Sequence, residues 1–319
     1  MIGQDISQAK RILEAGELVA IPTETVYGLG GNALNPVAVA SIFETKNRPS
    51  FDPLIIHVPS LSEAENYVTE IPKPLWILAE QFWPGPLTLL LPRKANIPDI
   101  VTSGLERVAV RVPDHSLTLE LLTQLEFPLA APSANPFGYI SPTSPQHVDA
   151  QLGGKVSYIL DGGNCRVGLE STIVGMEGDE IVVYRLGGLD LSEIENMVGK
   201  IIVKSHSSSN PQAPGLLESH YAPTKPFLIG DLEELISDQD PHGNDFAVLS
   251  LSQQFPSIPT ENQIALSESG DLKEAATNLF AAMRILDNTN TQVILAEMMP
   301  EKGLGKAIND RLKRAATKS

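Results

Sequence analysis

Two cations, Lys46 and Arg48, lie two residues apart, just before an apolar run that ends at His57. A lysine and an arginine this close together can neutralise a phosphate group or another small anion. Both would lie at the C-terminal end of a predicted helix, 36–46, that Pro49 stops, and its dipole alone favours cations there by about 0.3–1 kcal/mol. We therefore expect replacement of either cation to change stability by no more than about 0.5 kcal/mol, as at a surface position.

Two arginines lie in segments that otherwise resemble buried strands. Arg111 is enclosed by "VAVRVP", and an unpaired guanidinium there would be costly to bury, so its partner is either a structural carboxylate or an anionic ligand. The sequence does not choose between these partners. Arg185 in "VVYRLG" raises the same question, although an arginine at a strand end is often a solvated edge charge. The role of His57 is open in the same way. It either contacts a ligand or is a core residue, which is the commoner fate of a histidine at the end of a buried strand.

Small polar residues follow two of the predicted strands. Thr23, Glu24 and Thr25 come directly after "LVAIP", and a loop rich in glycine and proline carries Ser133 and Asn135. The same loop continues to Ser141 and Thr143. Such residues either bind a ligand or satisfy their own backbone in a turn.

Several common catalytic and nucleotide-binding patterns do not fit this sequence. No nucleophile elbow surrounds Ser133, and the histidines and the single cysteine, Cys165, lack the spacing of a zinc site or a disulfide. "GLGGNA", residues 28–33, fits a dinucleotide pattern only formally, because no acid follows about 20 residues on, and we interpret it as a tight strand-to-helix connection. "GLGKA" near residue 305 lacks the P-loop hydroxyl. We predict no protein-bound metal site.

The composition describes a globular, acidic protein. The 319 residues carry a net charge of −16, and residues 226–300 alone hold 12 acidic and 2 basic side chains. Because nucleic acids are bound mainly through their phosphates, we expect no tight direct binding to RNA or DNA. No apolar run approaches the length of a membrane span, and the first residues read as a capped amphipathic helix, so we expect a cytoplasmic protein without a membrane anchor.

The elements that must position these side chains alternate between strands and helices, which is typical of an α/β fold. The predicted helices are 36–46, 62–69, 74–82 and 145–152, and the predicted strands are 18–22, 53–58, 87–92, 108–113, 127–131 and 156–160. A hairpin is predicted between "STIVGM" and "EIVVYRL" around "EGD".

A change of composition divides the chain. Residues 204–226 are rich in serine and proline and have no periodicity, which indicates a linker between a first domain, 1–203, and a second, 227–319. In the second domain, "FLIG", "DFAVLSLS" and "QVILAEMM" read as strands and 272–287 as a helix. We predict a smaller, Rossmann-like α/β domain there.

Taken in order, seven motifs resemble the YrdC-type family of L-threonylcarbamoyl-AMP synthases. They are "IPTETVYGLGGNA", "KNRPSFDPLIIHV", "FWPGPLTLLLP", "VAVRVP", "APSAN", "LESTIV" and "YRLGG". "HYAP" and "GLGKAINDRLKRAA" resemble the longer, two-domain form of that family. The resemblance implies a YrdC-like twisted open mixed sheet with helices, joined to the smaller α/β domain.

The reaction that the resemblance implies joins L-threonine, bicarbonate or CO2, and ATP into threonylcarbamoyl-adenylate and pyrophosphate. The product would pass to a complex that transfers the threonylcarbamoyl group to tRNA. Because the threonine carbamate would attack the α-phosphorus of ATP, this chemistry needs positioning and charge stabilisation and no protein nucleophile. Mg²⁺ would accompany ATP and share the neutralisation of its phosphates with Lys46 and Arg48, the expected catalytic residues.

The family motifs also assign individual residues. The ATP side would comprise Lys46, Arg48, Asp52, Asn135, Thr143, Arg185 and Tyr221, and the L-threonine side Thr25, His57, Arg111, Ser133 and Ser171. Tyr221, in the linker, would close over the site as a lid. Ahead of "HYAP", where the family commonly has basic residues, this chain has Glu218 and Ser219.

Two alternative functions belong to other classes of protein. An RNA-binding YrdC-like module without adenylate-forming activity is the main alternative, and the net charge counts against it. A carbamoyl-transfer domain like those of hydrogenase-maturation proteins would need cysteine-rich zinc segments, which this sequence lacks.

Overall fold

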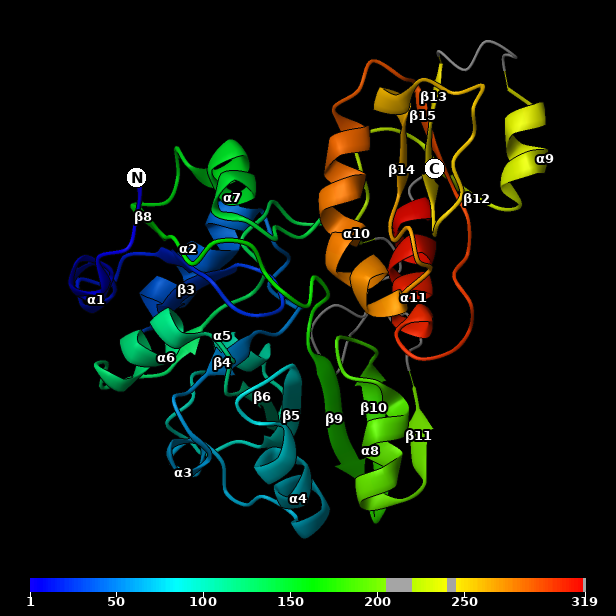
Figure 1. The fold of residues 1–319 in the computed structure, drawn as a ribbon. Helices are drawn as coiled ribbons and strands as arrows, with labels where there is room; N and C mark the ends of the chain where they lie inside the picture. The colour runs from blue at the N-terminus through cyan, green and yellow to red at the C-terminus, as the bar shows by residue number, and fades with distance from the viewer. Residues whose placement is uncertain (205–219, 240–244, 318–319) are drawn as a thin grey trace.

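The computed structural model describes residues 1–204, 220–239 and 245–317. These residues form a large mixed sheet with its helices and a second, smaller parallel sheet with its own helices (Figure 1). The predicted α/β fold class is therefore confirmed. Most of 204–226 lies outside the described residues, as do Glu218 and Ser219, and the domain boundaries at 203/204 and 226/227 stay a prediction.

The first unit is built on an 11-stranded sheet. In spatial order its strands are β1 (Ile2–Gly3), β8 (Tyr158–Leu160), β2 (Val19–Ile21), β3 (Gly28–Asn32), β7 (Leu129–Ala130), β4 (Ile55–His57), β6 (Arg107–Arg111), β5 (Leu87–Pro92), β9 (Thr172–Glu177), β10 (Glu180–Arg185) and β11 (Ile201–Val203). Every predicted strand of this unit is present, and the predicted hairpin is the antiparallel pair β9 and β10. The parallel pairing of β4 with β6 places His57 opposite Arg111.

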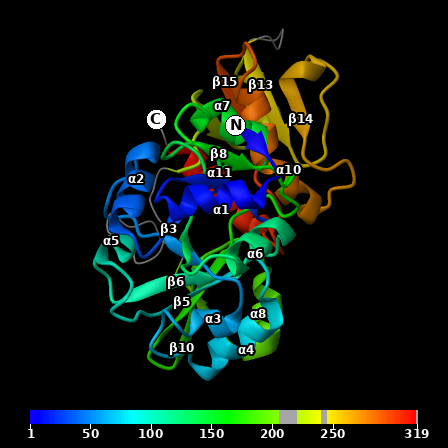
Figure 2. The same ribbon diagram turned by 90° about the vertical axis from the view of Figure 1, so that its left-hand side faces the viewer.

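The helices of the first unit cover the sheet. They are α1 (Ile6–Glu14), α2 (Pro36–Lys46), α3 (Leu61–Ala64), α4 (Lys73–Phe82), α5 (Asp99–Thr102), α6 (Ser116–Thr123), α7 (Pro145–Leu152) and α8 (Leu191–Val198). Helix α1 packs on β3 and β8 beside α6 (Figure 2). The helix predicted at 62–69 is shorter than expected, because turns replace it after Ala64.

Helix α2 begins and ends at identifiable caps. The side-chain oxygen of Asn35 accepts hydrogen bonds from the backbone N–H groups of Val37 and Ala38, which otherwise have no partner in the first turn. At the other end Asn47 adopts a left-handed conformation with φ 52°, and its N–H is bonded to the carbonyl of Glu44. Asn47, two residues before Pro49, therefore ends the helix.

The interpretation of "GLGGNA" as a connection is wrong, because Gly28–Asn32 is the strand β3 between β2 and β7. A side chain at Gly31 would come within 2.8 Å of Leu18, and one at Gly30 within 3.2 Å of the Val19 carbonyl. Glycine therefore serves here to let two neighbouring elements approach closely.

The side chains of the central strands β4 and β6 point alternately to the two faces of the sheet. Ile56 and Val110 belong to the main core, whereas Ile55 and Ala109 belong to a smaller apolar cluster on the opposite face. Because successive side chains point to opposite faces, His57 lies on the Ile55 face. Arg111 shares that face, so the strands set two polar side chains side by side.

In the described part of residues 220–317, the second unit is a four-stranded, all-parallel sheet with three α-helices. The strand order is β12 (Phe227–Ile229), β15 (Val293–Ala296), β13 (Phe246–Ser250) and β14 (Gln263–Ala265), and the helices are α9 (Leu232–Ser237), α10 (Leu272–Asp287) and α11 (Gly305–Ala316). The predicted strands and the predicted helix 272–287 are confirmed, while β14 was not predicted.

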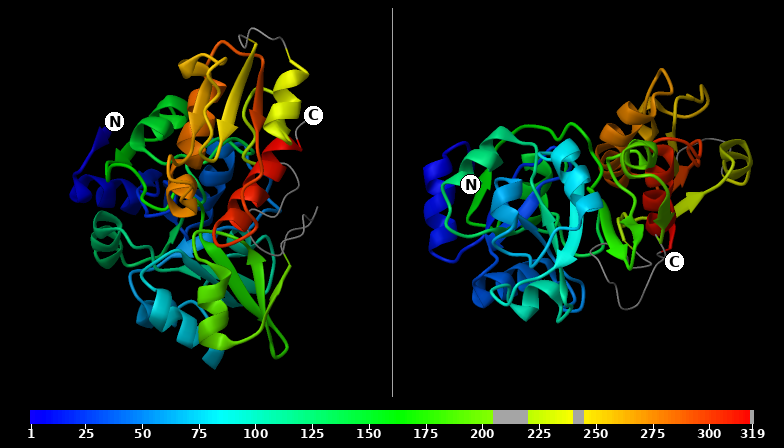
Figure 3. Two further views of the ribbon diagram at one scale, coloured as in Figure 1. Left: turned by 45° about the vertical axis from the view of Figure 1, so that its right-hand side comes forward. Right: turned by 90° about the horizontal axis from the view of Figure 1, so that it is seen from below.

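Helices α10 and α11 join the second unit to the first (Figures 1 and 3). In α10, Arg284 donates to the backbone carbonyls of Ile140 and Ser141, and in α11 the guanidinium of Arg311 pairs with Glu170. Within the described residues, no helix is both long and apolar enough to cross a membrane.

Candidate active site

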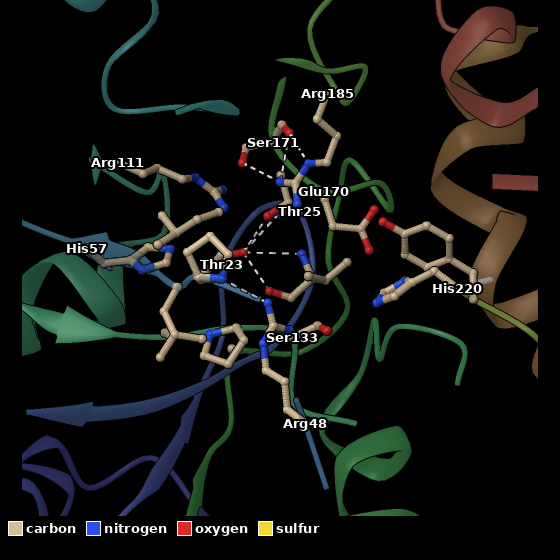
Figure 4. Close-up of a pocket in the computed structure, with 18 residues that line it drawn as sticks. Thr23, Thr25, Arg48, His57, Arg111, Ser133, Glu170, Ser171, Arg185 and His220 are labelled. Carbon is tan, nitrogen blue, oxygen red and sulfur yellow. Dashed lines mark hydrogen bonds between the residues drawn. The ribbon is translucent and has the colours of Figure 1, made fainter. Parts of the chain in front are cut away.

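A pocket lies over the sheet face that carries His57 and Arg111 (Figure 4). The ends of β2, β7 and β10, the start of β9 and the loop after α2 contribute its walls, and residues 220–221 close one side. The open space between these side chains is about 50 Å³. On the same scale a single water needs about 10–15 Å³, so the pocket has room for a few water molecules.

A tight turn after β2 supplies two hydroxyl groups to the pocket. The Thr23 Oγ1 accepts from the backbone N–H groups of Thr25 and Val26 and donates to the Val26 carbonyl at 2.7 Å. It also lies 2.8 Å from the Thr25 Oγ1. Thr23 thus satisfies the backbone of its own turn, as the sequence allowed. Both threonines also line the pocket, and binding of a ligand by them stays a prediction.

The partner of Arg111 is a carboxylate of the same chain. Its guanidinium lies 2.7 Å from the Glu24 carboxylate, and its Nε donates to the Gly85 carbonyl at 3.2 Å. Both side chains of the pair are at most 5% exposed. The burial of Arg111 therefore does not require an anionic ligand, although the side chain borders the pocket.

Burial keeps the neighbouring histidine uncharged. His57 is 2% exposed, and its burial together with the charge of Arg111 lowers the pKa of the imidazole to about 3. Its Nδ1 has no hydrogen-bond partner among the described residues. A neutral imidazole at pH 7 can accept or donate a single hydrogen bond to a ligand, and it does not supply a positive charge.

The lowered pKa of His57 makes stability depend on pH. The imidazole titrates near 6.5 when unfolded and at about 3 when folded, so between these values the unfolded state binds one more proton. The free energy of unfolding should therefore fall as the pH falls, by about 2 kcal/mol between pH 7 and pH 5 from this group. His57→Asn should unfold in urea with a shallower pH dependence by that amount, whereas equal slopes in the two proteins would contradict the prediction.

Ser171 and Arg185 form one hydrogen-bonded unit at the upper wall of the pocket in Figure 4. The Arg185 Nη2 donates to the Ser171 carbonyl at 2.9 Å and to its hydroxyl at 3.0 Å. The hydroxyl of Thr88 in β5 lies 2.7 Å from the Ser171 hydroxyl. Burial lowers the pKa of Arg185 to about 10, which still leaves the guanidinium positively charged at neutral pH.

The expectation that Lys46 and Arg48 behave as surface cations is wrong. Lys46 is 1% exposed, and its ammonium group contacts the backbone carbonyls of Ser133, at 2.5 Å, and Asn135. Arg48 is 9% exposed and lies 2.8 Å from the Asp52 carboxylate. Lys46 is thus held by the loop after β7 and Arg48 by the chain after α2, so both serve as structural contacts and not only as helix-end charges.

The pocket gathers most of the predicted residues but not all of them. Arg48, Arg185, Tyr221, Thr25, His57, Arg111, Ser133 and Ser171 line it. Lys46, Asp52, Asn135 and Thr143 do not. Lys46 and Asp52 lie one contact behind the wall, through Ser133 and Arg48. The Asn135 amide donates to the carbonyls of Pro136 and Tyr139, and the Thr143 N–H donates to the Nδ1 of His147.

Comparison with known proteins identifies the family. The Sua5/YciO/YrdC family model, described as "Telomere recombination", matches residues 11–187, and the model described as "Threonylcarbamoyl-AMP synthase, C-terminal domain" matches residues 189–317. The chain belongs to the Sua5/YciO/YrdC family. It is 42% identical over 97% of its length to the threonylcarbamoyl-AMP synthase of Pyrococcus abyssi, 93% of which is covered. It is 39% identical over 98% of its length to that of Bacillus subtilis, 92% of which is covered.

A solved structure shares the whole arrangement. P. abyssi Sua5 complexed with L-threonine superposes with a TM-score of 0.92 at 40% identity, covering 99% of this chain and 97% of that one. The two units thus share the fold of P. abyssi Sua5. Since its relatives are synthases, this Sua5-family chain is an enzyme.

Two titratable pocket residues of this Sua5-family chain had no role assigned from the sequence. Glu170 precedes Ser171 in "LESTIV", and His220 precedes Tyr221 in "HYAP". The His220 ring makes edge contacts with Phe137 and Tyr221, at centroid distances of 5.9 and 4.1 Å. Both residues are adjacent to ones that the motifs did assign, and this adjacency is the only signal by which the sequence points to them.

Proposed function

We propose that this protein makes L-threonylcarbamoyl-adenylate and pyrophosphate from L-threonine, bicarbonate or CO2, and ATP. The observation that carries this proposal is the convergence of two kinds of side chain on one pocket. Arg48 and Arg185, expected on the ATP side, line the same space as Thr25 and His57, expected on the threonine side. The names of the relatives and the threonine complex of P. abyssi Sua5 support it.

The threonine side offers small polar groups around a neutral imidazole. The hydroxyls of Thr25 and Ser171 and the Nδ1 of His57 suit the amine and hydroxyl of an amino acid. Arg111 is fixed by Glu24, and we propose that its guanidinium also attracts the threonine carboxylate. Ser133 would lie between the two substrates.

The proposed chemistry balances without a protein nucleophile. The amine nitrogen of threonine bonds to the carbon of CO2 and loses a proton, and a carbamate oxygen then attacks the α-phosphorus of ATP. The bond from that phosphorus to the bridging oxygen breaks, and pyrophosphate leaves with the electron pair. Arg48 and Arg185 would stabilise the charge that develops on the phosphate oxygens.

The carboxylates around the pocket indicate how magnesium would enter. Asp52 is paired with Arg48 at 2.8 Å, Glu24 with Arg111 at 2.7 Å, and Glu170 with Arg311 at 3.0 Å. Because each of these three carboxylates is paired with an arginine, we propose none of them as a ligand of a metal ion bound permanently to the protein. We propose that Mg²⁺ arrives bound to the phosphates of ATP, as part of the substrate.

Entry of ATP would require residues 220–221 to move. Pockets for ligands of this size usually hold about 300–1,000 Å³, far more than the present space of about 50 Å³. Tyr221 closes one wall in a left-handed backbone conformation, φ 64°, which a bulky side chain rarely adopts. We propose that Tyr221 withdraws to admit ATP and returns to exclude water from the labile adenylate.

The wider role follows from the same reaction. The mixed anhydride would be passed to a tRNA threonylcarbamoyl-transfer complex, and we propose that the reaction takes place in the cytoplasm. The net charge of −16 supports contact with that complex, and not with tRNA itself, as the route of transfer.

The direct test is pyrophosphate release by the purified protein. With Mg-ATP and bicarbonate, release should depend on L-threonine, and L-serine should support less, because it lacks the methyl group. An RNA-binding module without this activity predicts the opposite result, namely no threonine-dependent release together with RNA binding that weakens as salt is raised. That outcome would overturn the proposed function.

A further inference from the structure

One side chain of the second unit reaches the pocket wall. Arg311 in α11 is fully buried, and its Nε and Nη2 donate to the Glu170 Oε2 at 3.1 and 3.0 Å. Its guanidinium also lies 5.3 Å from the centroid of the Tyr221 ring, within the range of a cation–π contact. Because Glu170 and Tyr221 both line the pocket, Arg311 touches two parts of its wall from behind (Figure 4 shows the pocket side).

The contacts leave the Glu170 carboxylate no freedom to turn. The second oxygen, Oε1, accepts from the Ser141 hydroxyl at 2.6 Å, so each oxygen has its own donor. The side chain is 6% exposed, and a buried carboxylate is strongly destabilising when its cation is removed. The following residue, Ser171, carries the hydrogen bonds of Arg185.

Tyr221 is held from two sides by the second unit. Its ring stacks on that of Phe280 in α10, with centroids 5.4 Å apart and planes 26° apart, and Arg311 lies near its face. A tyrosine with φ 64° persists only where its surroundings hold it. The second unit therefore holds the position of the residue that closes the pocket.

We propose that Arg311 is a positioning residue for the ATP side of the pocket, so that the second unit is a working part of the site. It compensates the Glu170 charge, which would otherwise compete with the phosphates of ATP for Arg185, and it holds the Tyr221 ring. This inference rests on the proposed function in one respect, namely that the nucleotide bound in the pocket is ATP.

The test compares Arg311→Gln with Tyr139→Phe by titration with a fluorescent ATP analogue. Tyr139→Phe also removes a contact between the two units, a partly buried hydrogen bond of 2.6 Å to Asp287, but Tyr139 does not line the pocket. Arg311→Gln should weaken ATP binding at least tenfold and L-threonine binding by less than twofold. Tyr139→Phe should leave both within twofold of the parent protein.

A rescue variant separates charge compensation from loss of structure. Adding Glu170→Gln to Arg311→Gln removes the uncompensated charge and should recover at least threefold of the lost ATP affinity. If Arg311→Gln does not fold, Arg311→Lys takes its place, with an expected loss of about threefold, since an ammonium group keeps the charge but not the two parallel bonds.

The inference is overturned if Arg311→Gln binds ATP like Tyr139→Phe, or if its affinities for ATP and L-threonine fall together. It is equally overturned if the double variant recovers nothing. Failure of the proposed function gives a different result: the parent protein would then release no threonine-dependent pyrophosphate, while the ATP-binding comparison would still decide the role of Arg311.

Discussion

Arg111→Leu is expected to lower the free energy of unfolding by about 3–5 kcal/mol. The substitution leaves the Glu24 carboxylate buried without the guanidinium that lies 2.7 Å from it, and among the described residues only the backbone N–H of Asp114 still donates to that carboxylate. An uncompensated charge of this kind costs more than the pair itself gains. Urea unfolding at pH 7, with the slope of the transition unchanged, measures the loss.

Lys204→Ala is a matched control, because it also breaks an ion pair. Lys204 and Glu177 are paired at 2.5 Å, but their side chains are 46% and 37% exposed. Water solvates both charges after the substitution, so the loss of stability should be much smaller than that of Arg111→Leu. Adding Glu24→Gln to Arg111→Leu should recover part of the stability, because it removes the buried charge. Equal losses in the free energy of unfolding for Arg111→Leu and Lys204→Ala would show that burial does not make breaking the Arg111–Glu24 pair more costly, which would contradict the prediction.

Lys46→Met is expected to reduce threonine-dependent pyrophosphate release by about 100- to 1,000-fold, the usual effect of losing one preorganised electrostatic contact in an active site. The ammonium group holds the backbone carbonyls of Ser133 and Asn135. Ser133 lines the pocket, so loss of this contact releases a wall of the site. The steady-state rate, measured well below the unfolding temperature, tests the prediction.

The same substitution should also destabilise the protein, by about 1–3 kcal/mol for a buried carbonyl left without a donor. Lys94→Met is its control, since the Lys94 ammonium also donates to a backbone carbonyl, that of Glu65, but on the exposed surface. That variant should keep full activity and nearly full stability. A loss of activity below tenfold in Lys46→Met would remove Lys46 from the catalytic residues.

Local signals in the sequence predicted most elements of the fold. Asn35 and Pro36 mark the start of α2, and the regular spacing of apolar residues marks α10 over its full length. These signals act within a few residues, so they do not depend on the rest of the fold. The strand β3 was missed because its glycines are explained only by what packs against them, Leu18 and Val19.

The residue types and motifs determined, by themselves, most of the charged and hydroxyl side chains that line the pocket, and the family to which the chain belongs. Only the tertiary structure decided what each buried charge pairs with. Arg111 pairs with Glu24, 87 positions away, and Arg311 with Glu170, 141 positions away. A sequence shows that a buried arginine needs an anion, but the identity of that anion depends on which distant segments the sheet and the second unit bring within 3 Å.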